Sequence, residues 1–295
     1  MKLDSVRELK QSLPGKLSSM LADRTSARRS SSVAVASAAS LHRSAPSYFL
    51  GVTAKGKTGN NLAVCLQDRA LEKSELVARI SASAKGEVDV RYAGRIRARA
   101  TRWYRSKQRP LLIGSSVGFI ANGFIMAGTL DGGNPTSDRV AKLTRFVRLT
   151  TGQPNLIDCA TAKLNANAAV DLHKLRGIGT LAGQREGELE IGHIVHKVGR
   201  TTGVRHGRVT AFELDGLEVE YDIGVVSFDD QIEIEGSGTR SFSDSGDSGS
   251  LIVDDDHMGA ALLFAGSDDG GRNGEGLIFA NPLSAVLKAL KVRLA

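Results

Sequence analysis

The order of apolar and polar positions divides the chain into three parts. In the first, residues 1–45, one short helical segment runs from Ser5 to Leu21 and is interrupted at Pro14. A stretch rich in Ser, Ala and Arg follows it, from Arg24 to Ser40. A segment of this composition buries too little apolar surface to fold alone. The pattern therefore predicts a short helix followed by a flexible tail.

The second part, residues 46–108, has the pattern of a small α/β module. An apolar run at Phe49–Val52 is followed by another at Leu62–Leu66 across a turn rich in Gly, Lys and Asn, which predicts a hairpin. Apolar positions between Leu71 and Ala82 recur at helical spacing, and Glu87–Tyr92 alternates as a strand does. Strand, helix and strand in this order predict one compact unit in front of the main body.

The third part, residues 109–295, predicts an all-β body. After Pro110, short apolar runs alternate with Gly, Asn and Asp every eight to twelve residues as far as Phe279. This spacing is typical of a β-sandwich or a β-barrel. The chain closes with a helix after Asn281-Pro282, in which Asn is the expected cap and Pro occupies the first turn.

One segment of this body also has the length of a membrane helix. Leu111–Leu130 contains no charged residue and follows a basic stretch. It also contains four glycines and Asn122, which interrupt a helix in water. These residues fit two short buried strands joined by an Asn122-Gly123 turn. We expect strands here and no membrane segment, with a membrane helix as the alternative.

The composition excludes global disorder and reveals an uneven charge distribution. The 295 residues include 41% hydrophobic residues, and 39 Lys+Arg against 32 Asp+Glu give a net charge of +7. Residues 1–110 carry 22 basic and 8 acidic side chains, whereas residues 111–295 carry 17 and 24. This division indicates a basic front segment joined to an acidic body.

The start of the chain and the cysteines predict a cytoplasmic protein. Asp4 and Glu8 lie near the first residue, and no apolar core follows the basic residues as it does in a secretory signal. The two cysteines, Cys65 and Cys159, are too few for a disulfide framework.

A basic stretch is a candidate surface for nucleic acid. Residues 91–110 contain eight Arg or Lys and no acidic residue, with Trp103 and Tyr104 among them. Phosphate contacts and base stacking would use such residues. The alternative interpretation is a solvated connector that docks on the acidic body, and we favour it. The arginines that would contact nucleic acid are Arg91, Arg95, Arg97, Arg99, Arg102 and Arg105.

The most informative segment for chemistry is Ser243–Ser250. It contains Gly246-Asp247-Ser248-Gly249 and is followed by an apolar strand. A nucleophilic serine needs a tight turn that exposes its hydroxyl, with backbone amides beside it that bind an oxyanion. Gly246 permits the backbone angles of such a turn. Ala260–Ser267 then offers an edge to which an extended peptide can pair. The alternative is an ordinary polar loop between two strands.

Four motifs together resemble the chymotrypsin-like serine peptidases, and within them a bacterial subgroup. The resemblance covers about residues 110–295 and lies in the motifs Gly246-Asp247-Ser248-Gly249-Ser250, Leu262-Leu263-Phe264-Ala265-Gly266-Ser267, His196-Lys197-Val198-Gly199-Arg200-Thr201-Thr202-Gly203 and Ala280-Asn281-Pro282.

This resemblance implies a mainly β fold, a double β-barrel with the active site between the barrels. It implies Ser248 as the nucleophile, with the amides of Gly246 and Ser248 as the oxyanion hole. Asp158 resembles the triad aspartate, and its alternative role is a strand-end cap. The substrate strand corresponds to Phe264, Ala265 and Gly266. The first barrel is expected to be truncated, with the α/β module before it and the helix after it.

The histidine that the triad requires is missing from the sequence. No histidine lies between Arg43 and Leu172, where the family carries its general base. Either Thr129 occupies that position or, as we favour, a segment is missing between Leu130 and Asp131. The six histidines present are His42, His173, His193, His196, His206 and His257.

Besides nucleic-acid binding through residues 91–110, two functions therefore remain open from the sequence. The first is a serine endopeptidase that hydrolyses peptides or proteins through Ser248, impaired by the loss of its base. The second is an inactive relative that binds peptides or acts as a scaffold. We expect no metal and no cofactor, because no metal-ligand spacing is found in the sequence.

Overall fold

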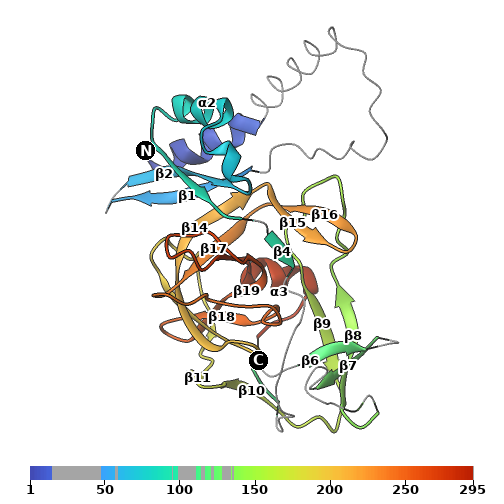
Figure 1. Cartoon of the computed structure of the whole chain (residues 1–295). Helices are drawn as coiled ribbons and strands as arrows, with labels where there is room; N and C mark the ends of the chain where they lie inside the picture. The colour runs from blue at the N-terminus through green and yellow to red at the C-terminus, as the bar shows by residue number, and fades with distance from the viewer. Residues whose placement is uncertain are drawn as a thin grey trace, which may run out of the picture.

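The computed structural model shows a mainly β chain with few helices (Figure 1). The segments 15–47 and 99–110 fall outside the residues it describes, as do shorter stretches before residue 136. The described residues are 1–14, 48–56, 59–94, 96–98, 111–113, 117–120, 123–127, 134 and 136–294.

The front of the chain folds as the predicted hairpin, helix and strand. Strand β1 (Tyr48–Lys55) pairs antiparallel with β2 (Gly59–Leu66), and β2 pairs parallel with β3 (Val88–Tyr92). Helix α2 (Glu75–Ser83) connects β2 to β3 and follows a short 3-10 turn, η1 (Arg69–Leu71).

The two helices of the front part differ from their expected bounds. Helix α2 begins at Glu75 rather than at Leu71, because the Ser74 hydroxyl accepts a hydrogen bond from the Val77 amide and caps the first turn there. The first helix covers residues 3–14, so it begins before Ser5, and its expected continuation to Leu21 lies outside the described residues. Val6 of this helix packs against Ile80 of α2 in one apolar cluster.

Six strands of the body form a closed antiparallel barrel. Its ring follows the pairings β13–β14, β14–β17, β17–β20, β20–β19, β19–β18 and β18–β13. The interior is filled by apolar side chains that alternate along these strands, among them Val209, Ile234 and Leu263. The six strands are β13 (Ile194–Gly199), β14 (Gly203–Asp215), β17 (Gln231–Gly236), β18 (Leu251–Asp254), β19 (Met258–Ser267) and β20 (Leu277–Pro282).

The strands before this barrel form two smaller sheets. One has the order β6-β7-β8-β9 and the other β11-β10-β5, and among the described strands these do not close into a second ring. This confirms the predicted plan, in which the first barrel is truncated. The strands are β5 (Leu111–Ile113), β6 (Val117–Ile120), β7 (Phe124–Ala127), β8 (Arg139–Phe146), β9 (Ala160–Leu164), β10 (Val170–Leu175) and β11 (Gly179–Thr180). The two-residue strand β12 (Gly183–Gln184) instead pairs parallel with β19.

The uncharged segment Leu111–Leu130 contains strands, as expected. Ile120 of β6 pairs with Phe124 of β7, and Gly123 between them has a positive φ of 79°, which a tight turn requires. In the part of the chain that is described, no helix has the length and apolar character needed to cross a membrane.

Three further strands extend the barrel on one side. Strand β4 (Ile96–Ala98) lies between β19 and β15 (Leu217–Tyr221), and β15 pairs with β16 (Gly224–Phe228). The chain reaches this position from the front module, whose β1 also pairs with β14. The module and the barrel thus share one continuous set of pairings.

The closing helix α3 (Leu283–Leu290) forms as predicted, but its cap does not. Pro282 occupies the capping position without a side-chain hydrogen bond, and Asn281 belongs to β20. The Asn281 side chain instead bonds to the backbone of Asp158, which is why it is unavailable to the helix. The expected role of Asn281 as the cap was therefore wrong.

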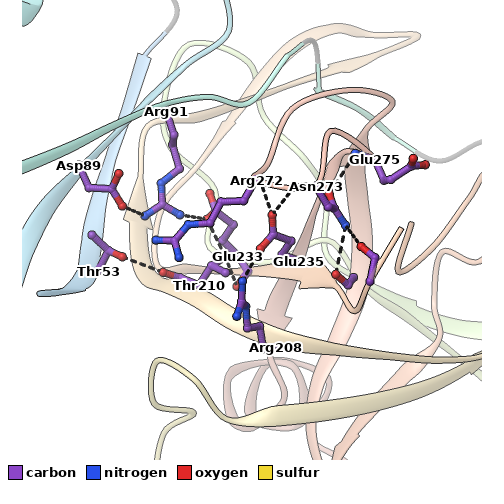
Figure 2. A network of polar contacts seen from close by, with 12 residues as sticks. Thr53, Asp89, Arg91, Arg208, Thr210, Glu233, Glu235, Arg272, Asn273 and Glu275 are labelled. Carbon is purple, nitrogen blue, oxygen red and sulfur yellow. Dashed lines mark hydrogen bonds and ion pairs between the residues drawn. The ribbon is translucent and has the colours of Figure 1, made fainter. Parts of the chain in front are cut away.

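A buried ion-pair network holds the front module on the barrel (Figure 2). Arg91 on β3 donates hydrogen bonds to Glu233 on β17, at 2.5 Å, and to Asp89, at 2.6 Å. Glu233 is fully buried, and it also accepts a hydrogen bond from the Thr210 hydroxyl at 2.7 Å. Burial alone would lower the pKa of Arg91, but the charge of Glu233 raises it, so the guanidinium stays charged.

Candidate functional site

The loop that carries Ser248 lies between β17 and β18 and is fixed on β19. The Gly249 amide donates to the Leu263 carbonyl at 2.7 Å, and the Leu263 amide donates to the Ser250 carbonyl at 3.1 Å. Gly246 and Gly249 both have positive φ values, 96° and 84°, which a residue with a side chain rarely adopts. The two glycines thus bracket Ser248 in a tight turn.

Ser248 itself lies on the exposed side of this turn. Its hydroxyl donates a hydrogen bond to the Phe264 carbonyl of β19 at 3.3 Å. The neighbouring Asp247 points the opposite way and is buried. Ser248 therefore faces the far half of β19, which the sequence predicted as the substrate strand.

The buried Asp247 anchors the loop to the β13–β14 hairpin. Its carboxylate accepts hydrogen bonds from the Lys197 ammonium at 2.6 Å, the Thr202 hydroxyl at 2.6 Å and the Thr201 amide at 2.7 Å. Lys197 has no exposed surface either. Burial alone would raise the pKa of Asp247, but Lys197 and these hydrogen bonds lower it below its usual range. The carboxylate is thus held in its charged form.

This ion pair explains the Val-Gly-Arg-Thr-Thr-Gly motif in structural terms. Thr201 and Thr202 of the motif, together with Lys197 just before it, provide the groups that bind Asp247. The sequence analysis identified the motif but assigned no role to Lys197. A lysine in a strand that also contains Ile194, Val195 and Val198 was the signal, since a buried lysine requires a charged partner.

Asp158 lies just before β9 and is bound by a residue that the sequence did not single out. Its carboxylate accepts a hydrogen bond from the Tyr221 hydroxyl of β15 at 2.7 Å. Its backbone is fixed by the Asn281 side chain, which accepts from the Asp158 amide at 3.0 Å. Burial raises the pKa of Asp158, and the Tyr221 hydrogen bond lowers it by less. Burial, together with the Asp158 charge, also raises the pKa of Tyr221, so this phenol stays protonated.

The described histidines that form hydrogen bonds do so with residues other than Ser248 and Asp158. His196 bonds to His206 through their Nδ1 atoms at 2.5 Å and to Asp255 through Nε2 at 2.6 Å. His193 accepts from the Glu190 amide at 2.9 Å. The two remaining described histidines lie in β10 and in the turn before β19, and they are His173 and His257.

Both explanations for the missing base concern residues outside the described set. These are Thr129, Leu130 and Asp131, and His42 of the tail lies outside it as well. Both alternatives therefore stay predictions: Thr129 in the histidine position, or a segment missing between Leu130 and Asp131.

The substrate strand is already paired, contrary to the expectation of an available edge. Strand β4 runs antiparallel to β19, with Ala98 opposite Ala265 and Arg97 opposite Gly266. Phe264, Ala265 and Gly266 are accordingly buried. A segment of the chain's own basic stretch occupies this edge, and the role of Phe264, Ala265 and Gly266 in substrate binding stays a prediction.

The basic stretch is described only in part. Arg91 is held in the ion pairs with Glu233 and Asp89, so its guanidinium serves the fold. Strand β4 includes the backbone of Arg97. The other candidate arginines lie outside the described residues and are Arg95, Arg99, Arg102 and Arg105. Nucleic-acid binding through this stretch stays a prediction.

Among the described residues, no group of three or more His, Cys, Asp and Glu side chains is arranged to hold a metal ion. Both cysteines are buried. Burial raises the pKa of Cys159 to about 11, and burial also raises the pKa of Cys65 well above its usual value. Neither thiol has the low pKa that a nucleophilic cysteine needs.

Comparison with known proteins gives a partial likeness. The family model for the Nal1 C-terminal domain matches residues 169–276, a range that contains Ser248 but not Asp158. No curated protein matches the chain.

Solved structures similar to the chain include serine proteases. Cellulomonas bogoriensis chymotrypsin is 21% identical, with 62% of this chain and 89% of that one covered and a TM-score of 0.39. Nocardiopsis protease is 20% identical over 62% and 90%, with a TM-score of 0.41. Thermobifida fusca protease A is 18% identical over 62% and 90%, with a TM-score of 0.39.

Proposed function

We propose that the chain is a protein with a serine-peptidase type of fold that binds extended peptides without hydrolysing them. The observation that carries this proposal is the hydrogen bond from Tyr221 to Asp158, at 2.7 Å. In a catalytic triad this carboxylate would accept from a histidine and stabilise the imidazolium that forms during the reaction. Here the hydrogen-bond donor to the Asp158 carboxylate is a phenol from β15.

Tyr221 is unsuited to replace histidine as a general base. Burial and the charge of Asp158 raise its pKa far above neutral, so it remains protonated and acts as a donor. A general base works best with a pKa near the working pH. Burial also raises the pKa of Asp158, and the hydrogen bond from Tyr221 offsets part of this rise.

The Ser248 loop remains suited to binding a carbonyl oxygen. The positive φ of Gly246 turns the backbone so that its amide and that of Ser248 can serve one oxygen atom. The buried ion pair between Lys197 and Asp247 fixes this turn on its buried side, opposite Ser248. These features support the amides of Gly246 and Ser248 as an anchor for a peptide carbonyl.

A second candidate function is peptide-bond hydrolysis through Ser248. The exposed position of Ser248 between two glycines with positive φ favours it. It requires a base from outside the described residues, for which His42 is the candidate.

Labelling with a fluorophosphonate probe separates the two candidates, because this reagent reacts only with an activated serine. We expect the wild-type chain to remain unlabelled, as does the Ser248→Ala control, while both show the same thermal unfolding. Labelling that Ser248→Ala abolishes would overturn the proposal in favour of hydrolysis. Loss of that labelling in a His42→Ala variant would then identify the base.

A further inference from the structure

One edge of β19 is divided between two strands and the Ser248 loop. The first half pairs with β18, with Leu262 opposite Leu251. The second half pairs with β4 through Ala265, Gly266 and Ser267. Between the two, the Leu263 amide bonds to Ser250, and the Phe264 carbonyl accepts from the Ser248 hydroxyl. Strand β4 therefore ends beside Ser248.

The direction of β4 brings its last residue toward the part of β19 that contacts Ser248. Because it runs antiparallel to β19, Ile96 lies opposite Ser267, and Ala98 lies opposite Ala265, next to Phe264. Along β4, from Ile96 to Ala98, the backbone thus approaches the Ser248 loop. An extended peptide that adds to a sheet edge uses these same backbone groups. Strand β4 and a peptide exclude each other on this edge.

The attachment of β4 is short. Strand β4 has only three residues, and it pairs with β15 at a single position, where Arg97 lies opposite Glu220. Its described anchor is the buried side chain of Ile96, which packs in the same apolar cluster as Phe264 and Ala265. Elements with few contacts open at a lower free energy than the core of a domain. Local release of β4 is therefore easier than unfolding of the barrel.

The charge around this edge indicates which peptides it accepts. Strand β4 belongs to the stretch 91–110, which has eight basic and no acidic residues. Exposed acidic side chains lie on the neighbouring elements, Glu220 on β15 and Asp268 and Asp269 directly after β19. Opposite charges across such a surface select the partner and suppress acidic competitors.

We propose that β4 is an internal ligand that occupies the peptide-binding edge of β19 and is displaced by an extended, basic segment of a partner protein. This inference rests on the proposed function, since it names the occupant and the regulation of the same site. Release of β4 exposes the backbone groups of Ala265, Gly266 and Ser267 beside the Ser248 loop.

The test exposes the edge of β19 by releasing β4 in the whole 295-residue chain. In the variant Arg97→Pro/Ala98→Pro, β4 loses the amides with which it pairs. The control Arg97→Ala/Ala98→Ser changes the same two side chains and keeps both amides. By hydrogen exchange, we expect the segment Ala265–Ser267 to exchange about tenfold or more faster in the proline variant than in the control. Strands β13 and β14 should remain protected in both.

Peptide binding is measured on the same two variants by fluorescence anisotropy. The probe is a labelled peptide that copies residues 93–99, Ala-Gly-Arg-Ile-Arg-Ala-Arg. We expect the proline variant to bind it about tenfold or more tightly than the control does, because no internal strand has to be displaced. A charge-reversed peptide with Glu for each Arg should bind neither variant.

Three results would contradict these proposals, each in a different way. Loss of protection in β13 and β14 together with Ala265–Ser267 would show that β4 is an integral part of the barrel, which overturns the inference. An exposed edge that binds neither peptide would overturn the proposed function. Equal binding of the charge-reversed peptide would overturn the assignment of a basic partner.

The wild-type chain gives a second measurement that does not depend on how the variants fold. If β4 opens locally, Ala265–Ser267 exchanges faster than the core amides of β13 and β14. Exchange at the same rate as the core would contradict the inference.

Discussion

Lys197 and Asp247 show how one buried ion pair sets the geometry of the Ser248 loop. Neither side chain is exposed, and the ammonium lies 2.6 Å from the carboxylate. Removing one partner of such a pair leaves a buried charge uncompensated. We expect Lys197→Met to lower the free energy of unfolding by about 3–5 kcal/mol, measured by urea denaturation.

The matched control is an exposed pair. Lys55 lies 2.7 Å from Glu87, but more than half of its side chain is exposed, so Lys55→Met should cost about 0–1 kcal/mol. The double variant Lys197→Met/Asp247→Leu should recover part of the loss, because no unpaired charge remains buried, while Thr201 and Thr202 lose their acceptor. A Lys197→Met variant as stable as Lys55→Met would contradict this account of the loop.

The raised pKa of Asp158 predicts a pH dependence with a defined sign. The folded chain favours the protonated carboxyl, so this group lowers the stability of the wild type as pH rises through its titration range. Asp158→Asn has no such titration and can still accept from Tyr221. We expect the stability of Asp158→Asn relative to wild type to increase between about pH 4 and about pH 7, measured by urea denaturation.

Asp171 is the control with the opposite sign. Hydrogen bonds from the amides of His173 and Lys174 lower its pKa, so its charged form favours the folded chain as pH rises. Asp171→Asn should therefore lose stability relative to wild type as pH rises from about 2 to about 5, because a carboxyl with a lowered pKa titrates at and below its usual range. The same sign of pH dependence for both variants would contradict the assignment for Asp158.

At the scale of elements, the contact between β3 and β17 depends on Arg91. Its guanidinium bridges the front module to Glu233 in the barrel, and Glu233 is fully buried. We expect Arg91→Met to lower the free energy of unfolding by about 3–5 kcal/mol, because the Glu233 charge then lacks its partner. Urea denaturation measures this loss.

The control for this prediction lies on α2. Arg79 pairs with Glu75 one turn away, and both side chains are close to half exposed. Arg79→Ala should cost only about 0.3–0.5 kcal/mol. If Arg91→Met costs no more than this, the module is not held by the buried ion pair.

Elements with a strong local pattern could be predicted from the sequence. The β1–β2 hairpin, helix α2 and the β6–β7 pair follow from apolar periodicity and turn residues within a few positions of each other. The three-part division of the chain stays a prediction, as does the cytoplasmic location.

The candidate site could be predicted only where a motif is local. Ser248 and its glycines form one continuous motif, whereas Tyr221 meets Asp158 from 63 residues away and carries no signal of that contact. Strand β4 contains three residues, too few for an alternation to show, and its partner on β19 lies far along the chain. The roles of Ser248 and Asp158 in binding or catalysis stay predictions.

At the scale of the whole molecule, the basic front and the acidic body meet through specific ion pairs. Lys10 of the first helix lies 2.9 Å from Asp215, and Arg7 bonds to Glu213. Together with Arg91 and Glu233, these contacts support the interpretation that positive charge in the front segment docks on the body. The basic strand β4 on β19 extends the same arrangement to the candidate site.

Fluorophosphonate labelling of the variant in which β4 is released tests most directly whether the chain binds peptides without hydrolysing them. If hydrolysis were only blocked by the internal strand, the Arg97→Pro/Ala98→Pro variant would become labelled at Ser248. We predict no labelling in this variant, in the wild type or in the Ser248→Ala control, because Asp158 is bound by Tyr221 rather than by a histidine. Labelling of the released variant that a further Ser248→Ala substitution abolishes would contradict the account and show an autoinhibited peptidase.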